Sequence, residues 1–166
     1  MKRALYLALF LALTAALAGG VLSLVNDVTK DTIAEARLEK ERDNLEKIFP
    51  NGEFVQKTEE VAEIPELLDL FEVEGKGKAY KIETNGYGGA ITYLVGFDEE
   101  DTIIGIAVIN HSETAGFGDV IETDAYADML IGSEASEELD TYSGATVSST
   151  AINEGIAIAA KHLEEE

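Results

Sequence analysis

The chain begins with one long apolar run. Residues 4–25 read ALYLALFLALTAALAGGVLSLV, contain no charged side chain and are rich in leucine and alanine. At ~1.5 Å rise per residue, a helix over this run would be about 33 Å long, enough to cross the ~30 Å hydrocarbon core of a membrane. A cleavable signal peptide is the alternative, because residues 16–18 (Ala-Leu-Ala) resemble a cleavage site. The apolar run continues well past that site, so we predict a retained transmembrane anchor over residues 1–26.

The charges that flank this run are distributed asymmetrically. Lys2 and Arg3 precede it, and the next charged residue is Asp27. Short, positively charged ends stay in the cytoplasm. We therefore expect a single-pass protein of the cell membrane, with its N-terminus inside the cell and the rest of the chain extracytoplasmic.

Residues 27–50 have the pattern of an amphipathic helix. Apolar residues recur on one face, at Ala34, Leu38, Leu45 and Ile48, and mixed charges cover the other face. The turn-forming sequence Pro-Asn-Gly at residues 50–52 ends the pattern. We predict a juxtamembrane helix over residues 27–50 that continues the membrane helix.

The remaining residues, 51–166, alternate between strand and helix patterns. β-Branched and aromatic runs separated by turn-type clusters predict an antiparallel sheet of at least three strands, over residues 78–84, 90–97 and 102–110. Three helices are predicted, over residues 64–71, 121–130 and 150–166. The first is expected to dock through Leu67, Leu68 and Phe71. The last is expected to point Ile152, Ile156, Ala159 and Ala160 inward. The fold class is α+β: an N-terminal transmembrane helix followed by a twisted antiparallel sheet with flanking helices.

Composition excludes several classes of function. The chain has 33 Asp and Glu against 12 Lys and Arg, a net charge of −21, which argues against nucleic-acid binding. It has no cysteine, so disulfides, thiolate chemistry and cysteine-ligated metals are excluded. His111 and His162 are too far apart in sequence to form a metal-ligand motif. Any demanding chemistry must come from carboxylates, hydroxyls, the backbone or a bound group.

Residues 140–150, DTYSGATVSST, gather hydroxyl side chains just before the last predicted helix. Ser143 or Asp140 is expected to cap that helix, leaving the amides of Gly144 and Ala145 free. Free amides at a helix N-terminus attract anions such as phosphate. On these local grounds, a hydroxyl-rich helix cap and an anion site both remain open.

The charge distribution weakens a purely ionic phosphate site. No Lys or Arg lies between Lys81 and Lys161. A phosphorylated ligand here would be held poorly by charge alone, whereas covalent attachment would hold it.

The same segment resembles the flavinylation motif of the FMN-binding domain family, D-x-x-[ST]-G-A-[ST]-x-[ST]. It matches at every fixed position, which here are Asp140, Ser143, Gly144, Ala145, Thr146 and Ser148. The resemblance implies that Thr146 carries covalent FMN through a phosphodiester, as phosphothreonyl-FMN. It also implies a dedicated flavin transferase that installs FMN from FAD with Mg²⁺ and reads Asp140, Ser143 and Ser148.

Two upstream segments resemble further elements of that family. Residues 111–118, HSETAGFG, are similar to H-x-E-T-P-G-x-G, with Ala115 where proline is usual, which loosens the backbone. Residues 85–89, NGYGG, look like the G-Y-G-G element. The cofactor-binding residues that the resemblance implies are His111, Glu113, Thr114, Gly116, Phe117, Gly118 and Tyr87. Among them, Glu113 and Thr114 are candidates for polar contacts, and Phe117 and Tyr87 for contacts with the face of the ring.

Together with the predicted anchor, the resemblance covers essentially the whole chain. The layout is similar to the G subunit of Rnf electron-transport complexes and to the C subunit of the sodium-pumping NADH:quinone oxidoreductase, and the short length favours the former. This implies a flavoprotein electron-transfer subunit of a membrane-bound ferredoxin:NAD⁺ oxidoreductase that translocates Na⁺ or H⁺. Its partners would be the other membrane and peripheral subunits. The chain would be one redox subunit of a translocase, with no catalytic residues and no metal site of its own.

Two other functions stay open. One is a membrane-anchored extracytoplasmic flavoprotein that carries electrons outside any pump. The other is a cofactor-free, membrane-tethered interaction domain. A hydrolase built from Ser143, His111 and Asp140 is disfavoured, because Ser143 lacks the G-x-S-x-G context.

Overall fold

The computed structural model describes residues 2–165, except for the side chains at positions 2, 4, 5, 8, 24 and 26–38. The chain divides into two compact units, Met1–Lys40 and Glu41–Glu166. A single helix, α1 (Lys2–Ile48), forms most of the first unit and extends into the second. Within the described residues, no helix meets both the length and the apolarity needed to cross a membrane, so the anchor predicted over residues 1–26 is not confirmed.

The helix predicted over residues 27–50 is confirmed as part of α1, which ends at Ile48. Leu45 and Ile48 are buried as expected, whereas Ala34 and Leu38 fall among the undescribed side chains. Asn51 has a φ of 56° and turns the chain away from the helix. The domain boundaries placed at residues 26 and 50 stay predictions.

The second unit is built on a five-stranded antiparallel sheet in which each strand pairs with the next along the chain. The strands are β1 (Phe54–Gln56), β2 (Leu67–Val73), β3 (Gly77–Asn85), β4 (Ala90–Phe97) and β5 (Ile103–Asn110). The helices are η1 (Thr58–Glu60), η2 (Gly118–Glu122), α2 (Asp124–Leu130) and α3 (Thr146–Glu164). The α+β class, the three predicted strands and the last two predicted helices are confirmed.

The helix predicted over residues 64–71 is wrong, because residues 67–73 form strand β2. The neighbours Leu70 and Phe71 are both buried, but they belong to cores on opposite faces of the sheet. Opposite placement of adjacent side chains requires the two-residue period of a strand. Leu68, expected to dock a helix, is 40% exposed. A short apolar run that is covered on both faces has no period that distinguishes strand from helix.

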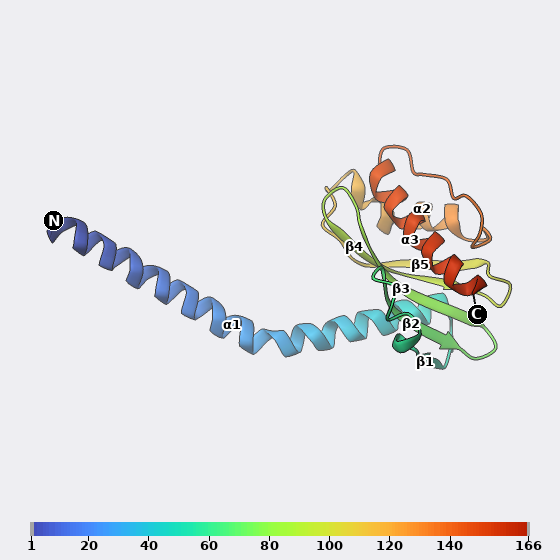
Figure 1. Cartoon of the computed structure of the whole chain (residues 1–166), viewed down its shortest axis with the longest axis horizontal. Helices are drawn as coiled ribbons and strands as arrows, with labels where there is room; N and C mark the ends of the chain where they lie inside the picture. Colours follow the sequence, from blue (N-terminus) through green and yellow to red (C-terminus); the bar gives the residue numbers. More distant parts are fainter. Residues whose placement is uncertain (1, 166) are drawn as a thin grey trace. The chain divides into compact units, whose positions relative to one another are not determined.

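Helices cover both faces of the sheet. On one face lie α2 and α3, and Figure 1 shows α3 extending across the strands. This core includes Tyr80, Ile82, Tyr93 and Val95 from the strands, Tyr126 and Leu130 from α2, and Ile152 and Ile156 from α3. On the other face, Leu45, Ile48 and Phe49 at the end of α1 pack against Phe71, Val73, Ala79 and Leu94. Both layers bury apolar surface against the strands, which stabilises the sheet.

The position of α3 on the sheet depends on a close contact with Tyr93. A Cβ atom on Gly155 would lie 2.1 Å from the Tyr93 hydroxyl, so only glycine allows the helix to come this near. The hydroxyl donates a hydrogen bond to the Ile152 carbonyl at 2.9 Å. Burial raises the pKa of Tyr93 above its ordinary value, so the phenol stays protonated and keeps donating. This contact fixes the helix whose first residue is Thr146.

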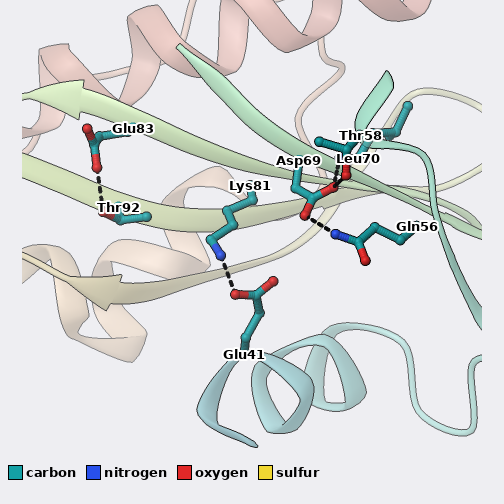
Figure 2. A network of polar contacts seen from close by, with 8 residues as sticks. All are labelled: Glu41, Gln56, Thr58, Asp69, Leu70, Lys81, Glu83 and Thr92. Carbon is teal, nitrogen blue, oxygen red and sulfur yellow. Dashed lines mark hydrogen bonds and ion pairs between the residues drawn. The ribbon is translucent and has the colours of Figure 1, made fainter. Parts of the chain in front are cut away.

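The sheet face toward the end of α1 carries polar contacts as well as apolar ones. Figure 2 shows Lys81 on β3 pointing toward Glu41 on α1, with which it forms an ion pair. On the same face, the Thr92 hydroxyl donates to a carboxylate oxygen of Glu83 at 3.1 Å. Glu41 is buried, so the ion pair compensates a carboxylate that has lost most of its water.

Asp69 forms the second polar cluster in Figure 2. Its carboxylate accepts hydrogen bonds from Gln56 Nε2 at 2.5 Å, from the Thr58 hydroxyl at 2.6 Å and from the Leu70 amide at 3.1 Å. Asp69 is buried, and these donors satisfy it without a cation. The cluster ties β1 and η1 to β2 at the edge of the sheet.

Candidate functional site

A cavity of about 530 Å³ lies at the start of α3. Its lining comes from all three segments that the sequence singled out: Tyr87, Glu113, Thr114, Phe117, Gly118, Gly144, Ala145, Thr146, Val147 and Ser148. These segments are far apart in sequence, and the meander of β3 to β5 together with the docking of α3 brings them together. We call this space the α3 cavity.

The carboxylate of Glu113 joins the three segments. Glu113 is only 9% exposed. One of its oxygens accepts the Gly88 amide at 3.0 Å, and the other accepts the Ser148 hydroxyl at 2.7 Å. Charge-assisted hydrogen bonds of this kind are stronger than neutral ones. Glu113 therefore holds the β3–β4 turn, its own loop and the first turn of α3 in one arrangement.

Glycines make room for this carboxylate. A Cβ atom on Gly86 would lie 2.2 Å from one Glu113 oxygen, and a Cβ atom on Gly118 would lie 2.4 Å from the other. A Cβ atom on Gly88 would lie 2.1 Å from the Ser112 carbonyl oxygen. These glycines could have been ordinary turn residues. In the folded chain they allow the Glu113 loop to lie against the β3–β4 turn.

The 111–118 loop is shaped by hydrogen bonds within and near it. His111 Nδ1 accepts the amide of Glu113 at 3.0 Å, and its Nε2 lies 3.2 Å from a carboxylate oxygen of Glu122. Gly116 has a φ of 80°, and its amide donates to Asp119. These contacts order the loop around Ala115.

Four predicted site residues, all within the described part of the chain, do not line the α3 cavity: His111, Gly116, Asp140 and Ser143. His111 and Gly116 shape the loop, as described above. Asp140 and Ser143 have exposed side chains and lie in the segment that precedes Thr146. The other predicted residues line the cavity.

The predicted caps of α3 are wrong. The N-cap residue is Ala145, which has no polar side chain, and its amide donates to the Tyr142 carbonyl at 3.1 Å instead of being free. Gly144, with a φ of 94°, turns the chain into the helix one residue earlier. The residue at the N-cap position is therefore neither Asp140 nor Ser143.

Two residues that the sequence did not single out hold the segment before α3. The Ser149 hydroxyl accepts the Tyr142 amide at 3.0 Å. The Asn153 amide group donates to the carbonyls of Leu139 at 2.9 Å and Asp140 at 3.1 Å. Both lie within the helical pattern of α3, so no local signal marks them. Val147, which lines the cavity, was also missed, although it lies inside the motif.

Thr146 is the first residue of α3, and its side chain is exposed at the cavity. The first amides of an α-helix lack partners within the helix, and the helix dipole favours negative charge at this end. No Lys or Arg between Lys81 and Lys161 adds positive charge. A phosphate at Thr146 would therefore depend on backbone amides and on a covalent bond.

Two aromatic rings at the cavity fit a flat ligand. Tyr87 is 75% exposed and Phe117 is 68% exposed, and they come from different loops. Exposed aromatic rings beside a cavity offer a large apolar contact to a planar ring system. With the hydroxyl of Thr146 in the same wall, these residues fit a phosphate-bearing group that ends in a planar ring, as FMN does.

Comparison with known proteins agrees with this geometry. Residues 86–161 match the model of the FMN-binding domain, and residues 1–48 match that of the RnfG N-terminal region. The chain is 29% identical to the G subunit of the ion-translocating oxidoreductase complex of Photorhabdus laumondii, over 93% of this chain and 87% of that protein. It is 28% identical to the protein of the same name from Stutzerimonas stutzeri, over 93% of this chain and 78% of that protein. It is 33% identical to the protein of the same name from Salmonella typhi, over 68% of this chain and 60% of that protein.

Proposed function

We propose that the chain is an electron-transfer subunit of an ion-translocating oxidoreductase complex, because residues 86–161 match the model of the FMN-binding domain and the chain resembles the G subunits of such complexes over most of its length. The observation that carries this proposal is the α3 cavity. Its wall unites the loop around Glu113, the turn around Tyr87 and the start of α3 at Thr146. FMN bound there would supply one- and two-electron transfer, while the chain supplies its position and surroundings.

We further propose that FMN is attached covalently to Thr146. The Thr146 oxygen would attack the FMN phosphorus of FAD, forming a phosphodiester, while the phosphoanhydride bond breaks and AMP leaves. The hydroxyl proton passes to solvent, and nothing is oxidised or reduced. The exposed hydroxyl at the start of α3 and the absence of Lys and Arg over residues 82–160 support a covalent link over an ionic one.

The other cavity residues have distinct proposed roles. Tyr87 and Phe117 would lie against the faces of the ring, since both rings are exposed at the cavity. Thr114 and Glu113 would make polar contacts with the ring or the ribityl chain. Glu113 does this while it holds Gly88 and Ser148, because each carboxylate oxygen has a second lone pair.

The proposed partners follow from the relatives. We propose that the chain assembles with the other membrane and peripheral subunits of an Rnf-type ferredoxin:NAD⁺ oxidoreductase, and that a flavin transferase matures it. The predicted anchor over residues 1–26 would place the FMN-binding domain outside the cytoplasm. Co-purification with multispanning subunits would support this. Isolation of a flavinylated chain that never associates with them would favour a separate electron carrier.

The attachment is tested by producing the full chain together with a flavin transferase. We expect the intact mass to rise by one FMN less one water, and the denatured protein to fluoresce as a flavin on a gel. Thr146→Val should abolish both signals, because the only changed group is the proposed nucleophile. Thr150→Val, which removes a hydroxyl from the next turn of α3, is the matched control and should keep both.

Two results would contradict the proposal at different levels. Undiminished covalent flavin in Thr146→Val would place the link elsewhere. Colourless, unmodified wild-type protein that also fails to bind added FMN would remove the flavoprotein assignment, and would leave a cofactor-free interaction domain as the better explanation.

A further inference from the structure

The residues of the flavinylation motif differ sharply in accessibility. The side chains of Asp140, Ser143 and Thr146 are exposed. Ser148, by contrast, is only 2% exposed. A partner that approaches the folded chain can touch the first three side chains but not the fourth.

The burial of Ser148 has a specific cause. Its hydroxyl donates to Glu113 at 2.7 Å, and the other oxygen of that carboxylate accepts the Gly88 amide. Residues two apart on a helix point in roughly opposite directions, because each residue turns by about 100°. Ser148 therefore faces the Glu113 loop, while Thr146 stays exposed on the same first turn of α3.

The exposed part of the motif rests on a fixed backbone. Asn153 holds the carbonyls of Leu139 and Asp140, and Ser149 holds the amide of Tyr142. The Tyr142 ring also packs edge-on against Tyr126, with ring centres 6.3 Å apart. A surface that is ordered before binding spares the partner the entropic cost of ordering it.

A transferase that modifies Thr146 must approach its exposed surroundings, which include Asp140 and Ser143, and we call residues 140–146 the docking surface. We propose that Ser148, although it belongs to the motif, is not read by the transferase. It is a positioning residue that acts through its hydrogen bond to Glu113 and thereby sets the position of the first turn of α3. This rests on the proposed attachment of FMN to Thr146, and it divides the motif into a recognised part and a structural part.

The two parts predict different kinetic defects. Loss of a contact with the transferase weakens binding of the acceptor protein, so it raises KM. Displacement of Thr146 leaves the docking surface in place but misaligns the attacking oxygen, so it lowers kcat. Variants of Ser148 and Glu113 should share one defect, because each change breaks the same hydrogen bond.

The experiment uses the full chain, produced without transferase and then incubated with purified transferase, FAD and Mg²⁺. The rate of FMN addition is followed by intact mass as the chain concentration is varied. Ser148→Ala and Glu113→Ala should each lower kcat about tenfold with KM nearly unchanged, and the double variant should be no slower than the slower single variant. Asp140→Ala should raise KM about tenfold, and its effect should multiply with that of Ser148→Ala.

Two further comparisons keep the test valid if a variant folds poorly. Ser148→Thr keeps the hydroxyl and should recover most of the turnover, whereas Ser148→Val, which has the shape of the threonine variant without its hydroxyl, should not. Thr150→Ala removes a hydroxyl from the next turn of α3 and should behave as the wild type. Thermal denaturation of each variant shows whether the chain tested is folded.

The outcomes separate this inference from the proposed function. If the wild type gains no FMN, the attachment to Thr146 is wrong. If the wild type is flavinylated, but Ser148→Ala raises KM, or its effect multiplies with that of Glu113→Ala, then the transferase reads Ser148 directly and the division of the motif is wrong. Full turnover in Ser148→Val would also overturn it.

Discussion

The second unit contains two buried carboxylates with similar bonding and different surroundings. Asp69 is 7% exposed and Glu113 is 9% exposed, and both accept hydrogen bonds from uncharged donors. The donors to Asp69 lie within 13 residues of it in the chain, whereas the donors to Glu113 lie 25 and 35 residues away. Asp69 joins neighbouring elements at the edge of the sheet, whereas Glu113 joins distant ones around a cavity.

This contrast shows that a buried carboxylate does not by itself indicate a functional site. The face of the sheet around Asp69 also holds the Glu41–Lys81 ion pair, and its contacts tie the end of α1 and β1 to the sheet (Figure 2). The wall around Glu113 includes the exposed rings of Tyr87 and Phe117. We therefore expect substitutions on the sheet face around Asp69 and Lys81 to alter stability, and substitutions around Glu113 to alter flavin attachment.

The largest effect on stability is expected from Lys81→Met. The change leaves Glu41 buried without its cation, and should lower the free energy of unfolding by about 3 kcal/mol. Chemical denaturation measures this. The fraction of folded chain that accepts FMN should stay unchanged, because Lys81 lies away from the α3 cavity wall.

The double variant Glu41→Leu with Lys81→Met is the control. It removes both charges, so most of the lost stability should return. If the double variant is as unstable as Lys81→Met alone, an unpaired carboxylate is not the cause of the loss.

Asp69→Ala should have a somewhat smaller effect, about 2 kcal/mol, because it deprives the buried Leu70 amide and two side-chain donors of their acceptor. The measurement is again chemical denaturation, paired with intact mass after incubation with the transferase. Glu113→Ala is the matched comparison: we expect it to slow FMN addition, whereas Asp69→Ala should not. Equal slowing by both would show that the two regions are coupled and that the contrast between them is wrong.

The smallest effect is expected from Thr92→Val. The substitution keeps the side-chain shape and removes one hydrogen bond to Glu83, whose side chain is exposed. Water replaces the lost partner of an exposed carboxylate, so the cost should be about 0.5 kcal/mol or less. A loss well above that value, measured in the same denaturation experiment, would mean that this pair belongs to the structural network around Lys81.

Much of the fold could be predicted from local patterns. The runs that became β3, β4 and β5 carry strand residues between turn signals, and α3 shows its inner face through Ile152 and Ile156. β2 could not be predicted in the same way, because its neighbours Leu70 and Phe71 are both buried, on opposite faces, and interrupt the alternation of a strand pattern. The predicted start of the last helix, residue 150, is four residues too late. α3 begins at Thr146, before its apolar pattern starts.

For the candidate site, the residue types were visible in the sequence but their arrangement was not. Thr146, Glu113, Gly118 and Gly144 stand in recognisable motifs, and all four line the α3 cavity. Ser149 and Asn153 carry no such signal, because their contacts close a loop whose path depends on how α3 docks. Asp140 and Ser143 were predicted wrongly as caps of α3 for the same reason, because the path of the loop before the helix sets which residue stands at the N-cap.

By itself, the sequence determined which chemical groups are available: an acceptor hydroxyl beside Gly-Ala, the acidic composition, and no Lys or Arg over residues 82–160. Only the tertiary structure decided which groups are accessible. Packing of α3 on the sheet places Ser148 against Glu113 and leaves Thr146 exposed. Burial and hydrogen bonding between segments far apart in the chain depend on the packing of the whole domain, and two hydroxyls in one motif therefore have different roles.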